Sequence, residues 1–124
     1  MRIKRVKIGI KSLKEMLQDF VKTGEAIERG EKVKKEVGIY FESAEALRKA
    51  LTTKRLELIR LIKKHHPQNL HELARLAGRD VKNISQDVEL LRNLGLVSTK
   101  KEKNGRKAVS PDVDYDAIEL IIAV

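Results

Sequence analysis

The chain has 124 residues, 41% of them hydrophobic, and carries a formal net charge of +9. This length suits one domain with room for a small second lobe, and no apolar run approaches the roughly 20 residues of a transmembrane helix. Cysteine is absent, which excludes disulfides and cysteine-based zinc sites; with no signal peptide recognised at the basic N-terminus, a cytoplasmic protein without membrane partners is expected.

The first part of the chain is predicted to form a β-α-β extension over residues 1–51. Residues 2–11 alternate between apolar and polar side chains, which indicates a strand with one solvated face. Ser12 and Glu15 have the spacing of a capping box, so a helix is expected from Ser12 to near Gly30. Alternation returns in residues 34–43, a second strand, before a short helix. Such an extension is too small to hold a core alone.

Apolar residues at helical spacing predict three helices in the next part of the chain, near residues 54–66, 69–77 and 81–94. The first should end before Pro67, since the residue before a proline leaves the α region. The second is capped by Asn69 and ended by Gly78. The third begins at Asp80 and ends at Gly95.

A β-hairpin is expected after the third helix. Residues 96–102 indicate a strand, Asn104 and Gly105 form the strongest short hairpin signal, and residues 106–110 return until Pro111 stops them. The tail, residues 111–124, is acidic and then apolar, and is either a strand or a helix. The predicted fold class is therefore α+β, with a winged helix-turn-helix arrangement of three helices and a hairpin over residues 52–110.

Positive charge is concentrated in the middle of the chain. Residues 52–107 contain 14 Lys and Arg against 6 Asp and Glu, a net charge of +8. Residues 108–124 contain four acids and no Lys or Arg. A basic segment of this kind favours acidic partners such as nucleic acid.

The predicted helix 81–94 has two different faces. One carries an apolar stripe, and the other begins with uncharged amides and a lysine instead of the Glu/Lys mixture found elsewhere. Asn and Gln pair with adenine edges and Lys or Arg with guanine, and the start of a recognition helix meets the base edges. The base-reading candidates are Arg79, Lys82, Asn83, Ser85 and Gln86. An ordinary solvated surface is the alternative.

A second set of candidates would hold the DNA backbone. Cations on a hairpin can follow the phosphates or enter the minor groove, and amides at the start of the helix 69–77 could hold a further phosphate. The backbone candidates are Asn69, Lys100, Lys101, Lys103, Arg106 and Lys107. A solubilising loop is the alternative for the hairpin.

The run LHELARLAGRDVKNISQDVELLRNLGLVSTKKEKNGRKAV, residues 70–109, resembles the winged helix-turn-helix domains of prokaryotic MarR/ArsR-type regulators. The resemblance covers about residues 52–110 and implies a recognition helix from Val81 to Leu94 and a wing with its tip at Asn104 and Gly105. Residues 40–62 also resemble small predicted DNA-binding regulators, some of which sit beside toxin genes. The implied function is a sequence-specific transcriptional regulator of the repressor type that binds double-stranded DNA.

Partners other than DNA are also weighed. A homodimer is expected, because two recognition helices can meet successive half-sites. The strands and the tail would build the dimer surface or a surface for another partner, namely Val6, Ile8, Ile10, Val37, Ile39, Phe41 and residues 118–124. The rival functions are an antitoxin-like module that binds an acidic, toxin-like protein and an RNA-associated winged helix. The scarcity of aromatics argues against single-strand stacking.

No enzyme, metal or cofactor is expected. His65, His66 and His71 suit the end of a helix and its surroundings better than a metal site. The acidic residues of the tail lack the glycine and the final glutamate of a calcium loop. No nucleophile motif or phosphate-binding glycine fingerprint is present.

Overall fold

The computed structural model describes residues 3–33, 38–101, 109–122 and 124. These residues form an α+β protein with five helices and two small sheets, which confirms the predicted class. In chain order the elements are β1 (Arg5–Ile10), α1 (Leu13–Glu28), β2 (Gly38–Phe41), α2 (Ala44–Ala50), α3 (Thr53–His65), α4 (Leu70–Ala77), α5 (Val81–Leu94), β3 (Ser98–Lys101), β4 (Val109–Asp112) and β5 (Ala117–Ile121). They fall into a sheet unit, residues 1–49 and 115–124, and a helical unit, residues 50–114.

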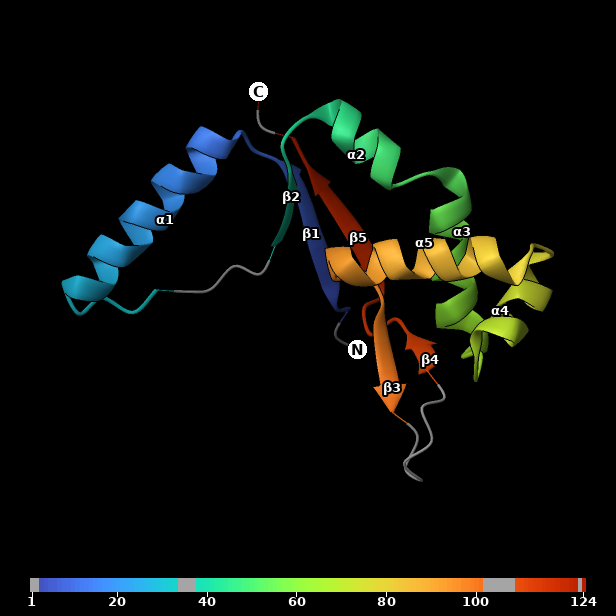
Figure 1. Ribbon diagram of the computed structural model, residues 1–124. Coiled ribbons are helices and arrows are strands. Elements are labelled where there is room, and N and C mark those ends of the chain that lie inside the picture. The colour runs from blue at the N-terminus through green and yellow to red at the C-terminus, as the bar shows by residue number, and fades with distance from the viewer. Residues whose placement is uncertain (1–2, 34–37, 102–108, 123) are drawn as a thin grey trace. The chain divides into compact units, whose positions relative to one another are not determined.

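The sheet unit is built on three parallel strands in the order β2-β1-β5 (Figure 1). The tail is thus a strand, and it pairs with the first strand of the chain. The backbone N–H of Lys4 donates to Asp116 Oδ2 at 2.9 Å, which fixes the start of this pairing. The predicted division set residues 111–124 apart as a tail, whereas β5 completes the sheet that the N-terminal residues begin.

One face of this sheet is aliphatic. Ile8 on β1 pairs in register with Ile39 and with Leu120, so their side chains share a face. Ile8 and Phe41 are buried within the chain. Both were expected on a surface for a second copy or another partner. This expectation is wrong for these two residues, because their side chains are already buried in the core of one chain.

The other face of the sheet carries an aromatic ring over two glycines. A Cβ at Gly38 would lie 2.9 Å from the Tyr40 ring, and one at Gly9 would lie 3.0 Å from it. The ammonium of Lys11 sits 4.2 Å from the centre of the same ring. Lys11 also donates to Asp19 of α1 at 2.8 Å, so α1 contacts the end of β1 through its polar side.

The helical unit has a core of aliphatic side chains from all three of its helices. The fully buried large residues of this unit are Leu58, Ile62, Pro67, Leu73, Ile84, Leu91 and Leu96. The helices α4 and α5 begin at Asn69 and Asp80 as predicted, and α3 begins at Thr52. Each of these side chains accepts a hydrogen bond from a backbone N–H group of the first turn. The helix α4 packs on both α3 and α5.

The strands β3 and β4 form an antiparallel ribbon in which Ser98 pairs with Asp112. The prediction that Pro111 stops the returning strand is wrong, since Pro111 lies inside β4 opposite Thr99. A two-stranded ribbon leaves one side of each strand without a ladder partner, and proline is tolerated at such an edge. The predicted turn at Asn104 and Gly105 lies outside the described residues.

Candidate nucleic-acid interface

The helix α5 is fixed at both ends and along one side. Asp80 accepts a hydrogen bond from the N–H of Lys82 at 3.0 Å. At the other end Gly95 adopts φ +86°, a left-handed conformation that suits glycine, and its N–H closes the last turn. Ile84, Val88 and Leu91 are buried and one turn apart, so burial of this stripe decides which side of the helix stays in solvent.

The polar residues predicted on the opposite side are exposed. Lys82, Asn83, Ser85 and Gln86 all lie in solvent. Helical spacing places Lys82 and Gln86 along the middle of this exposed side, directly opposite the buried stripe; we call this the central line. Asn83 lies on one border of the exposed side and Ser85 on the other, so the two cannot address one base pair together.

Two further residues, which were not predicted as site residues, lie on the same line. Glu89 lies three residues after Gln86, and Asn93 lies four residues after Glu89. Both side chains are exposed. Glu89 accepts from Arg92 at 3.3 Å. The same spacing rule that selected Gln86 could have found Asn93. We define the central line as Lys82, Gln86, Glu89 and Asn93.

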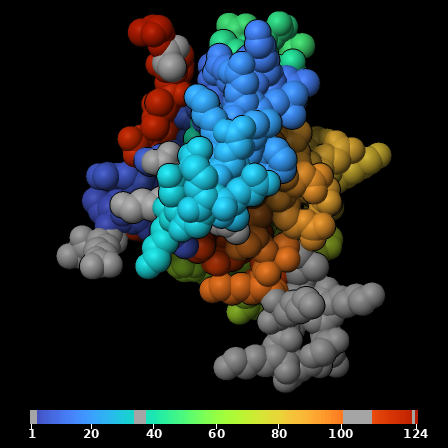
Figure 2. Space-filling model, turned by 90° about the vertical axis from the view of Figure 1, so that its left-hand side faces the viewer, coloured from blue at the N-terminus to red at the C-terminus, as the bar shows by residue number. Residues whose placement is uncertain are grey.

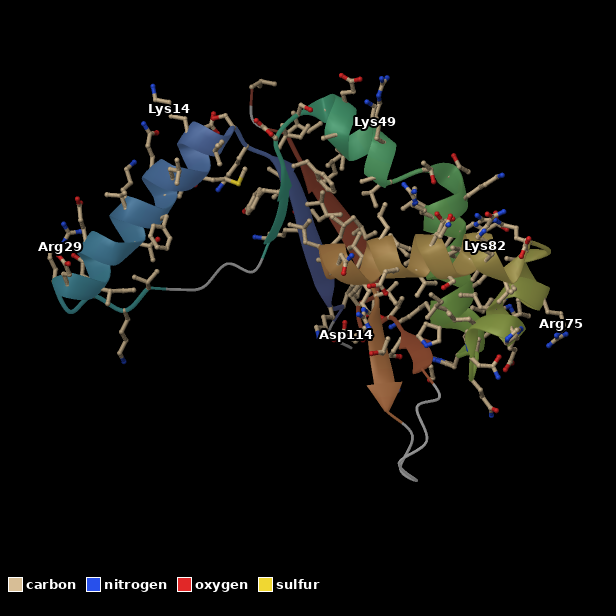
Figure 3. All side chains as sticks on the ribbon, viewed as in Figure 1. Lys14, Arg29, Lys49, Arg75, Lys82 and Asp114 are labelled. Atoms are coloured by element: carbon tan, nitrogen blue, oxygen red, sulfur yellow. The ribbon has the colours of Figure 1, made fainter. Side chains whose placement is uncertain are left out.

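Arg75 of α4 is a second cation that the sequence analysis missed. It is exposed, and Figure 3 shows it and Lys82 at the end of the helical unit where α4 meets the start of α5. The turn between these helices depends on Gly78 at φ +65°, whose N–H bonds to carbonyl groups of α4. The two helices therefore place two exposed positive charges, Arg75 and Lys82, beside this turn.

Arg79, a predicted base reader, is held in this structure by an acidic side chain of α5. Its Nη2 donates to Asp87 Oδ2 at 2.7 Å, while Arg55 Nε of α3 donates to Asp87 Oδ1 at 3.1 Å. The three side chains are only 15–21% exposed. We call these residues the Asp87 cluster. Through the shared Asp87 carboxylate, Arg79 and Arg55 link the turn before α5 and the helix α3 to α5.

The Asp87 cluster also changes the acidity of its carboxyl group. Burial by itself would raise the pKa of Asp87, but hydrogen bonds from Arg79 and then Arg55, with their positive charges, outweigh it. The net effect holds the pKa of Asp87 below its ordinary value of 3.8. The carboxylate is therefore charged at neutral pH and balances two cations.

The start of α4 is occupied by its own caps. Asn69 Oδ1 accepts from the N–H of Glu72 at 2.8 Å, as predicted. The Glu72 carboxylate accepts from the N–H of Gln68 at 3.1 Å, one residue earlier than a standard capping box requires. An acid at this helix end opposes a phosphate there, so the structure gives no support to phosphate binding by these amides.

The wing candidates are only partly described. Lys100 is exposed and lies 3.6 Å from Asp112 of the neighbouring strand. The backbone of Lys101 ends β3. Lys103, Arg106 and Lys107 lie outside the described residues.

Comparison with known proteins places the chain in a family. The model of the HVO_A0114 family matches residues 50–120, more than half of the chain. The chain belongs to the HVO_A0114 family. No curated protein gives a match. The family match contains the whole of α3, α4, α5, β3 and β4, so the exposed side of α5 and the Asp87 cluster lie within the part that this HVO_A0114 member shares with its family.

A solved structure is similar to this HVO_A0114 member over most of its length. The crystal structure of RV1404 from Mycobacterium tuberculosis aligns with a TM-score of 0.50 at 16% identity. The alignment covers 83% of this chain and 65% of that one, so the chain spans less than two thirds of that structure's length. A likeness at this identity concerns the fold alone.

The described part of this HVO_A0114 member has neither a metal-binding cluster nor a membrane-spanning helix. No group of three or more His, Asp or Glu side chains there could hold a metal ion. None of the helices described is both long enough and apolar enough to cross a bilayer.

Proposed function

We propose that this HVO_A0114 family member is a sequence-specific double-stranded DNA-binding transcriptional regulator of the repressor type. In this proposal the helical unit is a winged helix-turn-helix domain. The helices α4 and α5 form the helix-turn-helix, α5 enters the major groove, and the β3–β4 ribbon is the wing that contacts phosphates.

One observation carries the proposal: α5 buries an aliphatic stripe and exposes an amide and a lysine, Gln86 and Lys82, in its first turns. Both side chains lie on the line that would face a groove floor. A lysine suits guanine O6 and N7, and a glutamine suits adenine N6 and N7. The net charge of +8 over residues 52–107 supplies the attraction to phosphates.

The position of Glu89 limits how far α5 can enter the groove. Its carboxylate lies on the central line one turn beyond Gln86 and pairs with Arg92. A negative charge there is repelled by phosphates, although it could accept from cytosine N4. Base contacts are therefore expected from the first two turns of α5, where Lys82, Asn83 and Gln86 lie.

Selection of bound sequences from random duplex DNA at near-physiological salt tests the proposal directly. A recurrent motif of a few base pairs is expected for each copy of the helical unit. Enrichment of no motif would remove sequence-specific recognition. A competition in which structured RNA displaces duplex DNA would replace the proposal with RNA binding.

Replacing Gln86 by alanine should weaken binding to the selected sequence about tenfold to a hundredfold, because one good bidentate base contact is worth about 1–3 kcal/mol. Asn83→Ala should have an effect in the same direction. Binding to random DNA should change little for both. Gln18→Ala, which removes an exposed amide of α1 outside the helical unit, is the control. Fluorescence anisotropy with both DNAs measures this, and equal losses on the two DNAs would rule out base reading.

Replacing Lys100, Lys101 and Lys103 together by alanine should weaken binding to every DNA sequence. If each lysine neutralises one phosphate, the slope of log affinity against log salt should become shallower by about 3, since each phosphate contact contributes about 0.9. Titrations at several salt concentrations measure the slope. Lys49→Ala is the control, because Lys49 lies on α2 and pairs with Glu45 at 3.3 Å. An unchanged slope in the triple variant would remove the wing from the DNA contact.

A further inference from the structure

The helix α1 exposes its apolar side, unlike the helices of the helical unit. It has no buried residue. Phe20 is 77% exposed, and Leu17 and Ile27 are about 60% exposed. Figure 2 shows the blue-to-cyan helix uncovered along its length. A large apolar surface of this kind on a protein usually marks a site that binds another molecule.

The spacing of this apolar side fits another helix. Its members alternate at steps of four and three residues, and we call them the α1 stripe: Leu13, Leu17, Phe20, Gly24 and Ile27. This alternation is the seam of a left-handed coiled coil, in which side chains of one helix insert between those of the other. A helix that packs on a sheet has a similar spacing, so the sizes and charges of the side chains decide between the partners.

The sizes within the α1 stripe favour a second copy that runs antiparallel. Gly24 leaves a notch, since a Cβ there would meet nothing within 4 Å. When Phe20 faces Gly24 of the partner subunit, Leu17 faces Ile27 of the partner subunit, and two-fold symmetry repeats both pairs. One layer of the interface then pairs the large Phe20 with the small Gly24, and the next layer pairs Leu17 and Ile27, which are of intermediate size. A parallel pair would place two phenylalanines together and two glycines together.

Charge supports the same register. The antiparallel alignment places Lys14, which Figure 3 shows near the start of α1, beside Glu28 of the partner subunit, and symmetry repeats this pair at the other end. Val21 then lies close to Val21 of the partner subunit beside the two-fold axis. In a parallel alignment the flanking residues of α1 form no pair of opposite charge. Asp19, on the polar side of the helix, is already held by Lys11 at 2.8 Å.

We propose that α1 is the self-association helix of this protein, and that two copies pair antiparallel through the α1 stripe with Phe20 packed over Gly24 of the partner subunit. The proposal does not depend on DNA binding, because it uses no residue of the helical unit. It replaces the strands of the sheet unit as the predicted dimer surface. A seam of about two heptads is small, so we expect dissociation at micromolar concentrations.

Single cysteines test the pairing, since the chain has none of its own. Val21→Cys should give a disulfide-linked dimer under mild oxidation, because the two copies of this position meet beside the axis. Leu17→Cys should not link to itself, whereas a chain carrying both Leu17→Cys and Ile27→Cys should. Lys22→Cys, on the polar side, is the control. A link through Leu17→Cys alone would overturn the antiparallel register.

Sedimentation at a series of micromolar concentrations measures the dissociation constant of the dimer. Exchanging the charges of Lys14 and Glu28 tests the register. Lys14→Glu places like charges together twice in each dimer and should raise the dissociation constant about tenfold. Adding Glu28→Lys should restore it. A monomer throughout the concentration range, or a double variant no better than the single one, would overturn the proposal. A dimer with these properties that binds no DNA would leave it intact and remove only the proposed function.

Discussion

Replacing Ile84 by alanine should lower the free energy of unfolding of the helical unit by about 2–5 kcal/mol. Ile84 is fully buried and belongs to the stripe that holds α5 on the core. Truncation removes apolar contacts and leaves a cavity that the neighbouring side chains fill only in part. This is a large fraction of the stability of a small domain.

Urea unfolding followed by circular dichroism measures the total loss, and amide hydrogen exchange assigns it to α5. Ser85→Ala is the matched control, because Ser85 is the next residue on the same helix and is exposed; its effect should stay within about 0.5 kcal/mol. Faster exchange confined to the sheet unit would contradict the assignment. The loss should also weaken binding to any ligand of α5, since the unfolded fraction cannot bind.

Replacing Asp87 by asparagine should cost about 2–3 kcal/mol at neutral pH. Breaking a fully buried ion pair costs about 3–5 kcal/mol because it leaves an uncompensated charge, and the partial exposure of the Asp87 cluster reduces this figure. Arg55 and Arg79 would face each other without their shared carboxylate. The turn before α5 and the contact of α5 with α3 should both loosen.

The pH dependence of this effect has a definite sign. The pKa of Asp87 is lowered in the folded protein from 3.8, so its stabilisation is present above that value and is lost as the pH falls through the folded pKa. The difference between wild type and Asp87→Asn should therefore be constant near neutrality and shrink below about pH 4.

Urea unfolding at several pH values measures this difference. Glu89→Gln is the control, because the pair with Arg92 is exposed and should contribute less than about 1 kcal/mol. A difference between wild type and Asp87→Asn that grows on acidification would show that the cluster is not a charged pair.

Much of the helical unit could be predicted because its signals are local. Caps at Thr52, Asn69 and Asp80, and glycines at Gly78 and Gly95, specify where each helix begins and ends within a few residues of sequence. The apolar stripe of α5 likewise follows from spacing alone, and it correctly predicted which polar side chains are exposed.

The errors come from contacts between residues far apart in the chain. The ion pairs of Arg79 and Arg55 with Asp87 were not predicted, and Arg55 is 32 residues from Asp87. The partner of β5 was equally hidden, because apolar β-compatible residues do not specify which strand they join. Asn93 was a different kind of error, since helical spacing would have found it.

Residues 50–114 form the helical unit and separate β5 from the other two strands of its sheet along the chain. This separation affects the order in which the two units can fold during synthesis. The contact of Lys4 with Asp116 spans 112 positions, so one edge of β1 stays open until β5 has been synthesised. Contacts in the inserted segment close over much shorter distances along the chain and should form earlier. During synthesis β1 therefore gains its second neighbour only after the segment of residues 50–114 has left the ribosome.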